Sequence, residues 1–306
     1  MTSSTSSPDS TQAPRISTII ATMASPERGA ELRRAVASVR AASRAPVNLI
    51  VVVNGSRSDP QVVAWLQAQR DIVLVIDPMP SLPNALLRGR MLVETAFFST
   101  LDDDDEYTPG ALDLRLAAIE AAPGYDLVVT NGHRRSGGRD VLSYTTLAQV
   151  PVAPLAELFR TTWLQSGNAL YRAASVGVEF FADYHAYAEW TWLGFRLAHA
   201  GRRIGVLETP TFLCHDTPGS LSKSSAYRGA YMALYRRMLA VAPPAEVAQL
   251  IQRRIMAAWH DQSCQALDEG RLGEAWRCHL RSMAKPWGLR YLSYSRRLLP
   301  GWPVNP

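Results

Sequence analysis

Residues 97–109, FFSTLDDDDEYTP, decide how the rest of the chain is interpreted. The apolar run Phe97 to Leu101 predicts a short buried strand, and the acidic run Asp102 to Glu106 follows it directly. Five adjacent carboxylates repel one another, so we expect a cation among them. A hard divalent ion with oxygen ligands is the simplest candidate. The alternative is a solvated acidic loop, or an acidic segment that favours the N-terminus of the next helix.

Composition excludes several classes of protein. The chain has 306 residues, is 47% hydrophobic and fits one large or two smaller globular, soluble domains. Its formal charge of +5 comes with no zinc spacing or RNA-binding motif, so we expect no nucleic-acid partner. The odd number of cysteines, three, and the lack of a signal pattern indicate a reducing, cytoplasmic location. No apolar run is long enough to span a bilayer.

Strands and helices are predicted to alternate through the first half of the chain. The predicted strands are 16–22, 48–53, 72–76, 97–101 and 126–130. The helices expected between them are 27–42, 60–69, 82–95 and 109–122. This order predicts an α/β fold with a mostly parallel sheet and helices on both faces. No GxGxxG follows the first strand and no GxxxxGK[ST] occurs, so phosphates would need another device, such as the aspartates with a metal.

The second half is expected to be less regular and to end in helices. We expect a polar glycine-rich loop at 133–140, a helix at 155–164, a strand at 168–171, a helix at 185–199, and a strand at 204–207. Amphipathic helices then follow at 227–240, 245–268 and 270–284, with a basic tail at 287–302. That C-terminal extension either contacts an anionic membrane surface at the inner face, or packs on the catalytic domain or a second subunit.

The order of elements and three motifs resemble the family 2 glycosyltransferases of the GT-A fold. The motifs are Asn54-Gly55-Ser56 after the second strand, Leu101 followed by the four aspartates, and Pro109-Gly110. The resemblance covers about 16–222 and implies a GT-A (Rossmann-like) domain at 15–222. This domain would follow a disordered tail, 1–14, and precede the helical extension, 223–306. Within the domain, the nucleotide-sugar half would be about 15–131 and the acceptor half about 132–222.

The resemblance also implies an activity. A metal-dependent enzyme would move a sugar from a nucleoside-diphosphate donor, with a UDP-sugar favoured, to an acceptor hydroxyl with inversion. Mn²⁺ or Mg²⁺ would be the cofactor. The acceptor would be a sugar, a lipid-linked molecule or a natural product.

Carried over by position, the aspartates take separate roles. Asp102 would lie near the donor and the metal, and Asp104 would bind the metal. Asp105 would assist from outside the first ligand shell, and Asp103, in the family's variable slot, is counted with the donor-binding residues. His215, followed by the GSLS segment 219–222, becomes the third candidate ligand. A structural histidine is the alternative.

Three more residues are candidates for donor binding. Thr22 ends the first strand and would contact the nucleoside, or merely cap a turn. Asn54 stands where the family has an aspartate and can hydrogen-bond a base edge without supplying charge. Arg88 or Arg90 would face the diphosphate, with Arg88 preferred, unless both are ordinary helix-surface arginines.

The catalytic base is the largest departure from the family pattern. The family places an aspartate after a glutamate here, and this chain has Glu189 followed by Trp190. Glu189 is therefore the first candidate for the base that deprotonates the acceptor, and Asp183 is the second. The alternative for Glu189 is a salt bridge with a nearby basic group, for example Arg196. Trp190 and Trp192 would either wall the acceptor pocket or pack in the core.

Two rival functions stay open at this point. A sugar nucleotidyltransferase has a related sheet, but it normally carries a glycine-rich basic loop after the first strand, and ATMASPERG matches this poorly. A non-catalytic nucleotide-sugar-binding homologue would retain the fold and lack the base. Metal binding without sugar transfer or donor hydrolysis would identify the latter.

Overall fold

The computed structural model describes residues 13–216 and 225–299, with side chains omitted for 225–228. The chain forms two compact units, Met1–Ser220 and Leu221–Pro306. The predicted tail 1–14 therefore lies almost wholly outside the described residues. No helix in the described ranges has the length and apolar character needed to cross a membrane.

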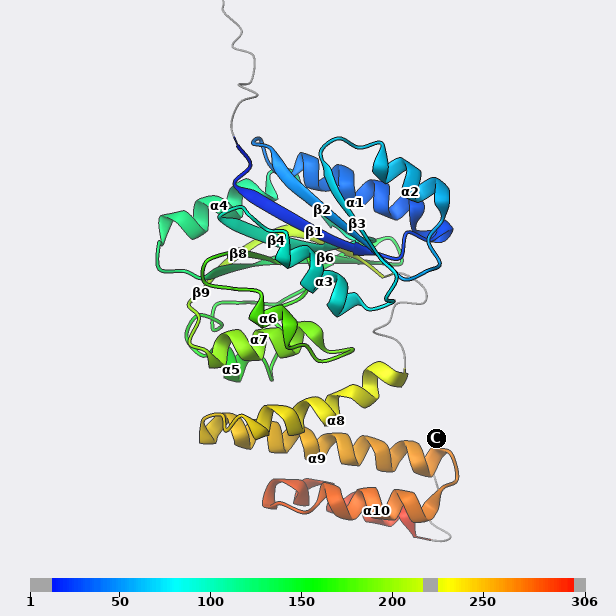
Figure 1. Cartoon of the computed structure of the whole chain (residues 1–306). Helices are drawn as coiled ribbons and strands as arrows, with labels where there is room; N and C mark the ends of the chain where they lie inside the picture. The colour runs from blue at the N-terminus through cyan, green and yellow to red at the C-terminus, as the bar shows by residue number, and fades with distance from the viewer. Residues whose placement is uncertain (1–12, 217–224, 300–306) are drawn as a thin grey trace, which may run out of the picture. The chain divides into compact units, whose positions relative to one another are not determined.

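A mixed nine-stranded sheet forms the centre of the first unit (Figure 1). Its strands are β1 Ile16–Thr22, β2 Val47–Asn54, β3 Ile72–Asp77, β4 Phe97–Asp102, β5 Glu106–Tyr107, β6 Leu127–Ser136, β7 Arg139–Leu142, β8 Ala169–Arg172 and β9 Ile204–His215. They lie in the order β3-β2-β1-β4-β8-β6-β9-β5, and β7 pairs with β6. The first four neighbours are parallel, whereas β8 is antiparallel to both β4 and β6.

Helices cover both faces of this sheet. They are α1 Gly29–Ala41, α2 Pro60–Gln67, α3 Leu82–Met91, α4 Ala111–Ala121, α5 Pro154–Glu157, α6 Glu179–Ala182 and α7 Glu189–His199, with a 3-10 turn at Pro26–Arg28. Figure 1 shows α1, α2 and α4 on one face and α3 and α6 on the other. All seven residues of β1 are buried, as expected for a central strand covered twice. The predicted α/β fold with a mostly parallel sheet and flanking helices is confirmed.

Several predicted elements in the second half of this unit are wrong. The predicted loop 133–140 is a β-hairpin of β6 and β7, because Gly137 and Gly138 both adopt positive φ and close a tight turn. The predicted helix 155–164 is only the single turn α5. The predicted helix 185–199 starts at Glu189, because Tyr187 adopts a φ of 65° that no helix accepts. The strand predicted at 204–207 runs on to His215.

The second unit consists of helices within its described residues. These are α8 Ser225–Ala240, α9 Ala245–Asp268 and α10 Leu272–Ser282, followed by a run of 3-10 turns, η3 Pro286–Leu298. The helices α9 and α10 are antiparallel neighbours in Figure 1. A small core of Ala266, Ala275, Tyr294 and Leu298 joins α9, α10 and η3. The helical C-terminal region is therefore confirmed.

Candidate donor and acceptor sites

Polar residues gather where the four parallel strands end. The register pairs Ala21 with Asp102, Thr22 with Val53, and Asn54 with Asp77. The carboxyl ends of β1, β2, β3 and β4 therefore bring polar side chains to one edge of the sheet. Ligands of open α/β sheets bind at this kind of edge.

Three carboxylates at the end of β4 form a group with the chemistry of a cation site. Asp102, Asp104 and Asp105 each offer an oxygen, and these oxygens lie within 4.8 Å of one another. The donors are all hard oxygen ligands, so the set fits Mg²⁺ or Mn²⁺. Asp102 and Asp104 are thus brought together as the sequence predicts, and Asp105 joins them.

Burial makes these carboxylates poorly tolerated as free charges. The pKa of Asp102 is raised to about 7, mainly by burial and also by the carboxylates of Asp104 and Asp103, while Ser166 and Arg28 oppose the rise. Burial also raises the pKa of Asp105 well above its usual range, with Asp102 adding to the effect and the His215 backbone N–H opposing it. A bound cation would reverse this penalty.

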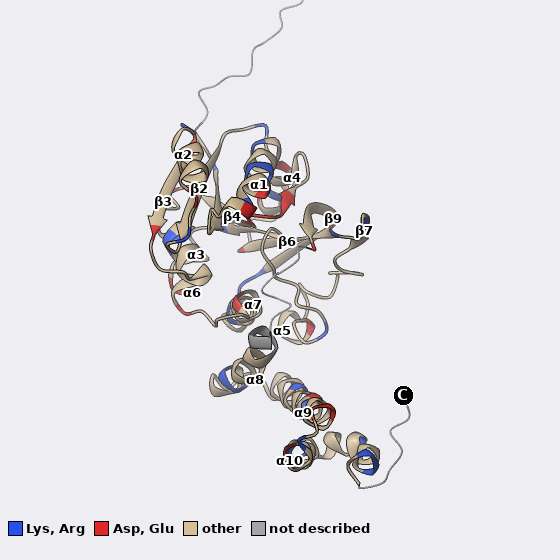
Figure 2. Ribbon diagram, turned by 90° about the vertical axis from the view of Figure 1, so that its right-hand side faces the viewer, with Lys and Arg blue, Asp and Glu red and all other residues tan. Residues whose placement is uncertain are grey.

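Two arginines supply positive charge to the acidic loop. Arg28 Nη1 lies 2.6 Å from Asp104 Oδ2 and 3.3 Å from Asp103 Oδ1. Arg34 Nε lies 2.9 Å from Glu106 Oε1, and its Nη2 donates to the Asp104 carbonyl at 3.0 Å. In Figure 2, red ribbon near the end of β4 lies close to α1, which carries blue segments. Sequence reasoning missed both arginines, although SPERG at 25–29, which contains Arg28, comes soon after the first strand.

Asp103 points away from the acidic trio. Its carboxylate accepts a 2.6 Å hydrogen bond from Thr22 Oγ1, and Thr22 Oγ1 in turn accepts from the Ala24 backbone N–H. Burial raises the pKa of Asp103, and the Thr22 hydroxyl opposes this. Asn54 Nδ2 donates to the Thr22 carbonyl at 3.1 Å. Thr22, Asn54 and Asp103 therefore hold the ends of β1, β2 and β4 together. Their predicted contacts with a donor stay predictions.

His215 ends β9 beside the acidic loop. Its backbone N–H donates to Asp105 at 2.9 Å, and its Nε2 lies 2.7 Å from Glu106 Oε1. This ring nitrogen faces Glu106, outside the trio of carboxylates. The role of His215 as a metal ligand stays a prediction, and the GSLS segment lies outside the described residues.

Arg88 belongs to a second polar cluster at the end of β3. Asp77 Oδ2 accepts from Arg88 Nε at 3.2 Å and from Asn84 Nδ2 at 2.9 Å. The backbone N–H of Met79 lowers the pKa of Asp77, and Asn84 and Arg88 lower it further. Arg88 is thus held at the same sheet edge as Asn54. The alternative, Arg90, is buried and donates to the carbonyls of Ala173 and Val176, which is a structural role.

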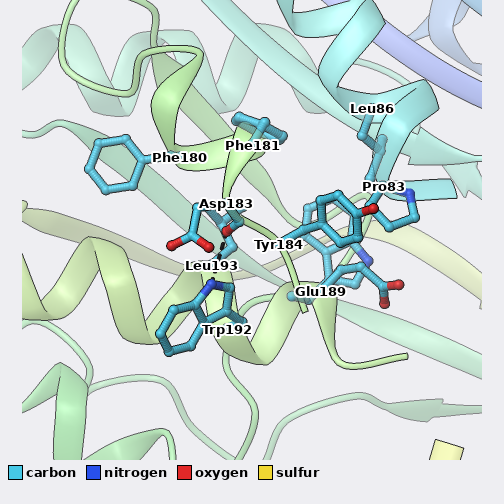
Figure 3. A pocket seen from close by; sticks show the side chains of 10 residues that line it. Pro83, Leu86, Phe180, Phe181, Asp183, Tyr184, Glu189, Trp192 and Leu193 are labelled. Atoms are coloured by element: carbon cyan, nitrogen blue, oxygen red, sulfur yellow. Dashed lines mark hydrogen bonds between the residues drawn. The ribbon is translucent and has the colours of Figure 1, made fainter. Parts of the chain in front are cut away.

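An open pocket lies beside the start of α7 (Figure 3). Its lining includes both candidate bases and both tryptophans, in the set Pro83, Leu86, Phe180, Phe181, Asp183, Tyr184, Glu189, Trp190, Trp192 and Leu193. The carboxylates of Asp183 and Glu189 point in different directions in Figure 3. The pocket is mostly apolar and aromatic, a lining that suits the faces of sugar rings.

The two candidate bases differ in their surroundings. Burial raises the pKa of Glu189, and hydrogen bonds from backbone N–H groups partly oppose this rise. One of these bonds is donated by the Tyr187 N–H to Glu189 Oε1 at 2.9 Å. Asp183 Oδ2 instead lies 3.4 Å from Arg196 Nε and forms an ion pair with it. Within the described residues no basic side chain forms a salt bridge with Glu189, so the predicted alternative of a pair with Arg196 is wrong.

Trp192 also helps to shape this pocket. Its Nε1 donates to the Asp183 carbonyl at 2.9 Å, and its ring stacks on Phe195 with centroids 5.7 Å apart. Trp192 is therefore buried in the core as well as lining the pocket.

The parallel strands, the acidic group at their carboxyl edge and the neighbouring apolar pocket define a protein of the GT-A class of α/β folds. A family model, glycosyl transferase family 2, matches residues 17–182. The chain belongs to this family and is a glycosyltransferase.

Solved structures of Staphylococcus aureus TarS share the fold. The chain is 16% identical to TarS 1-349 in complex with UDP-GlcNAc, with a TM-score of 0.60 over 93% of this chain and 88% of that one. The complex with UDP gives 16% identity, a TM-score of 0.56, and 93% and 87% coverage. TarS 1-349 on its own gives 15% identity and a TM-score of 0.58, over 93% of this chain and 87% of that one. No curated protein sequence matches the chain.

Proposed function

We propose that this glycosyltransferase uses a nucleoside-diphosphate sugar, with a UDP-sugar favoured, and a divalent cation, Mg²⁺ or Mn²⁺. The observation that carries the proposal is the group of Asp102, Asp104 and Asp105 oxygens within 4.8 Å at the carboxyl edge of the parallel strands. The fold shared with TarS bound to UDP-GlcNAc and to UDP supports this donor class. The ion would stabilise the charge that develops on the departing nucleoside diphosphate.

The chain's own residues would place the donor along the sheet edge. Asn54 and Asp77 stand side by side at the ends of β2 and β3, a position suited to the nucleoside. Arg88, 55% exposed in its side chain, is held beside Asp77 and can turn its guanidinium toward the diphosphate. Asp102, Asp104 and Asp105 would hold the cation, and His215 would complete the ligand set if its ring left Glu106.

Glu189 would take the proton of the acceptor hydroxyl. A raised pKa brings a carboxylate closer to the value at which a general base works at neutral pH. The carboxylate of Asp183 is held by Arg196 and is therefore less available to the acceptor. Attack on the anomeric carbon from the face opposite the diphosphate would invert its configuration. The aromatic pocket favours a sugar ring, or an apolar group that carries one, as acceptor.

A thermal-shift screen tests the donor site. Purified protein is heated with UDP, GDP, CDP and TDP and with UDP-sugars, each with and without Mn²⁺ or Mg²⁺. A ligand present at 100 times its dissociation constant stabilises the fold by about 2.7 kcal/mol. A shift with one diphosphate that requires the metal supports the proposal. Stabilisation by a nucleotide sugar without transfer or donor hydrolysis would instead indicate the non-catalytic binding homologue.

A further inference from the structure

Positive charge is concentrated in one segment of the second unit, residues 275–299. This segment contains six basic residues and no acidic one: Arg277, Arg281, Lys285, Arg290, Arg296 and Arg297. The segment's formal charge is thus +6, whereas the whole chain carries +5, so the other residues together are almost neutral. The thirty residues before it, 245–274, hold five acidic and three basic side chains. All six basic residues of 275–299 are exposed.

Large apolar side chains are exposed in the same segment. Leu280 is 60% exposed, Leu289 and Leu292 are each 58% exposed, and Leu299 is 50% exposed. Exposed apolar side chains that gather on one segment and are rimmed by polar residues are typical of protein or membrane interaction sites. Among the described residues, the core cluster of Ala266, Ala275, Tyr294 and Leu298 does not include these four leucines.

The 3-10 geometry of η3 sorts these side chains into rows. Residues three apart lie above one another in such turns. Gly288, Tyr291 and Tyr294 form the inner row, with Gly288 and Tyr294 buried. The second row begins with the exposed Leu289 and Leu292 and turns inward at Ser295 and the buried Leu298. Arg290, Ser293 and Arg296 form a third row, and all three are exposed. The leucine row therefore lies directly beside an arginine row.

The segment is held in this arrangement by contacts with α9 and α10. Trp276 Nε1 donates to the Leu298 carbonyl at 3.0 Å, and His279 Nε2 lies 2.7 Å from Ser295 Oγ. The ring of His260 stacks on Tyr291 with centroids 4.1 Å apart. The outward rows are thus formed before any partner arrives, so binding would not carry the cost of folding them.

We propose that residues 275–299 form a docking surface for an anionic lipid membrane. Its exposed leucines can enter the headgroup region while its basic side chains stay beside lipid phosphates. An acidic protein would also satisfy the charges, but it would have to cover four separate leucines along two elements. A nucleic acid would leave these leucines exposed to water. The lipid surface is the one occupant that both the charge and the apolar rows fit.

Vesicle co-sedimentation of the full chain tests this surface. The vesicles contain phosphatidylcholine alone, or phosphatidylcholine with 30% phosphatidylglycerol, at low and high salt. We expect binding to the anionic vesicles only, and weaker binding at high salt. Each basic residue near such a surface changes the partition coefficient about fivefold. Arg290→Gln with Arg296→Gln should therefore lower binding at least tenfold, and Leu289→Ser with Leu292→Ser should lower it without changing net charge.

A matched control removes two charges elsewhere. Arg44 and Arg70 are exposed arginines of the first unit, and Arg44→Gln with Arg70→Gln should bind vesicles as the unchanged chain does. Equal loss in this control, equal binding to neutral vesicles, or no binding would overturn the proposal. A different result of analytical ultracentrifugation would also overturn it. In that result the chain is an oligomer that does not bind vesicles, and Leu289→Ser with Leu292→Ser converts it to a monomer. Vesicle binding needs no nucleotide or transfer, so its failure leaves the proposed activity standing.

Discussion

The guanidinium of Arg28 lies 2.6 Å from the carboxylate of Asp104, one of the three aspartates grouped at the end of β4. Burial lowers the pKa of Arg28, but Asp103 and Asp104 outweigh burial, so the net pKa of Arg28 is raised. Part of the positive charge that the acidic loop needs therefore comes from the chain itself. A divalent cation at the trio would compete with Arg28 for Asp104.

Replacing Arg28 should strengthen metal binding. In Arg28→Ala, Asp104 no longer has this partner, and a hydrogen bond between charged groups contributes about 1.5–3 kcal/mol. We expect the dissociation constant for Mn²⁺ to fall roughly tenfold or more, as measured by electron paramagnetic resonance of free Mn²⁺ without nucleotide. Arg33→Ala is the control, because Arg33 lies in α1, just after Arg28 in the chain, but its guanidinium stacks on Trp65. Unchanged Mn²⁺ affinity in Arg28→Ala would show that the arginine does not compete.

Asp104→Asn should abolish metal-dependent donor binding and leave the fold intact. The amide removes one charged ligand from the trio, whereas Asp104 supports no strand pairing of the core. Calorimetric titration of UDP with Mn²⁺ measures the loss, and circular dichroism checks the fold. Asp103→Asn should keep the metal, because Asp103 faces Thr22 and Arg28. If Asp104→Asn binds donor as well as the unchanged chain does, the metal assignment is wrong.

The pKa of Asp102 predicts how the stability of the metal-free protein depends on pH. The pKa is about 7 in the folded chain and about 3.9 in the unfolded chain. The folded state therefore retains a proton that the unfolded state loses, so the free energy of unfolding should fall as pH rises from 4 to 7. One such group contributes a slope of at most about 1.4 kcal/mol per pH unit. Denaturant unfolding at several pH values measures the slope.

The control for this prediction is Asp102→Asn, which removes the titrating group. Its slope between pH 4 and 7 should be smaller than that of the unchanged chain. Equal slopes would assign the pH dependence to other groups.

Glu189→Gln should lose sugar transfer and keep donor binding. The amide cannot accept the acceptor's proton, and loss of a general base lowers the rate by about 10²–10⁴. Transfer assays with the donor found by thermal shift give the rate, and calorimetry gives donor affinity. Asp183→Asn is the matched variant, because both carboxylates line the same pocket. If only Asp183→Asn loses transfer, Asp183 is the base.

Gly89→Ala should destabilise the first unit. A Cβ at this position would lie 2.3 Å from Ile19 Cγ2 of β1, so α3 would have to move off the sheet. Overpacking of this kind costs about 1–3 kcal/mol. Gly273→Ala is the control, since a Cβ there meets no atom within 4 Å and alanine favours helix. Chemical denaturation compares the two, and equal stability would contradict the tight packing of α3.

The fold was predictable because the strands of the first half are apolar on both sides and the helices between them are amphipathic. The elements from 131 to 188 were less predictable from the sequence. The pair Gly137-Gly138 is typical of a loop, yet the positive φ values of these two residues close a hairpin. Tyr187 has no sequence signal for its φ of 65°, and this conformation delays the start of α7.

The candidate site was predictable where one segment supplies several of its residues. Asp102, Asp104 and Asp105 are neighbours in sequence, so their grouping at a strand end follows from one loop. Arg28 lies more than seventy residues earlier, and nothing local predicts that it reaches Asp104. Asp77 was missed for a similar reason, because only the parallel register of β2 and β3 places it beside Asn54 at the candidate site.

Helix α3 borders both candidate sites with different side chains. Asn84 and Arg88 contact Asp77 at the sheet edge, whereas Pro83 and Leu86 line the pocket that contains Glu189. The close approach of Gly89 to Ile19 fixes the helix between them. In evolutionary terms, the two specificities can diverge separately. Under the proposed function, substitutions at 83 and 86 would select new acceptors while 84 and 88 preserve the same donor.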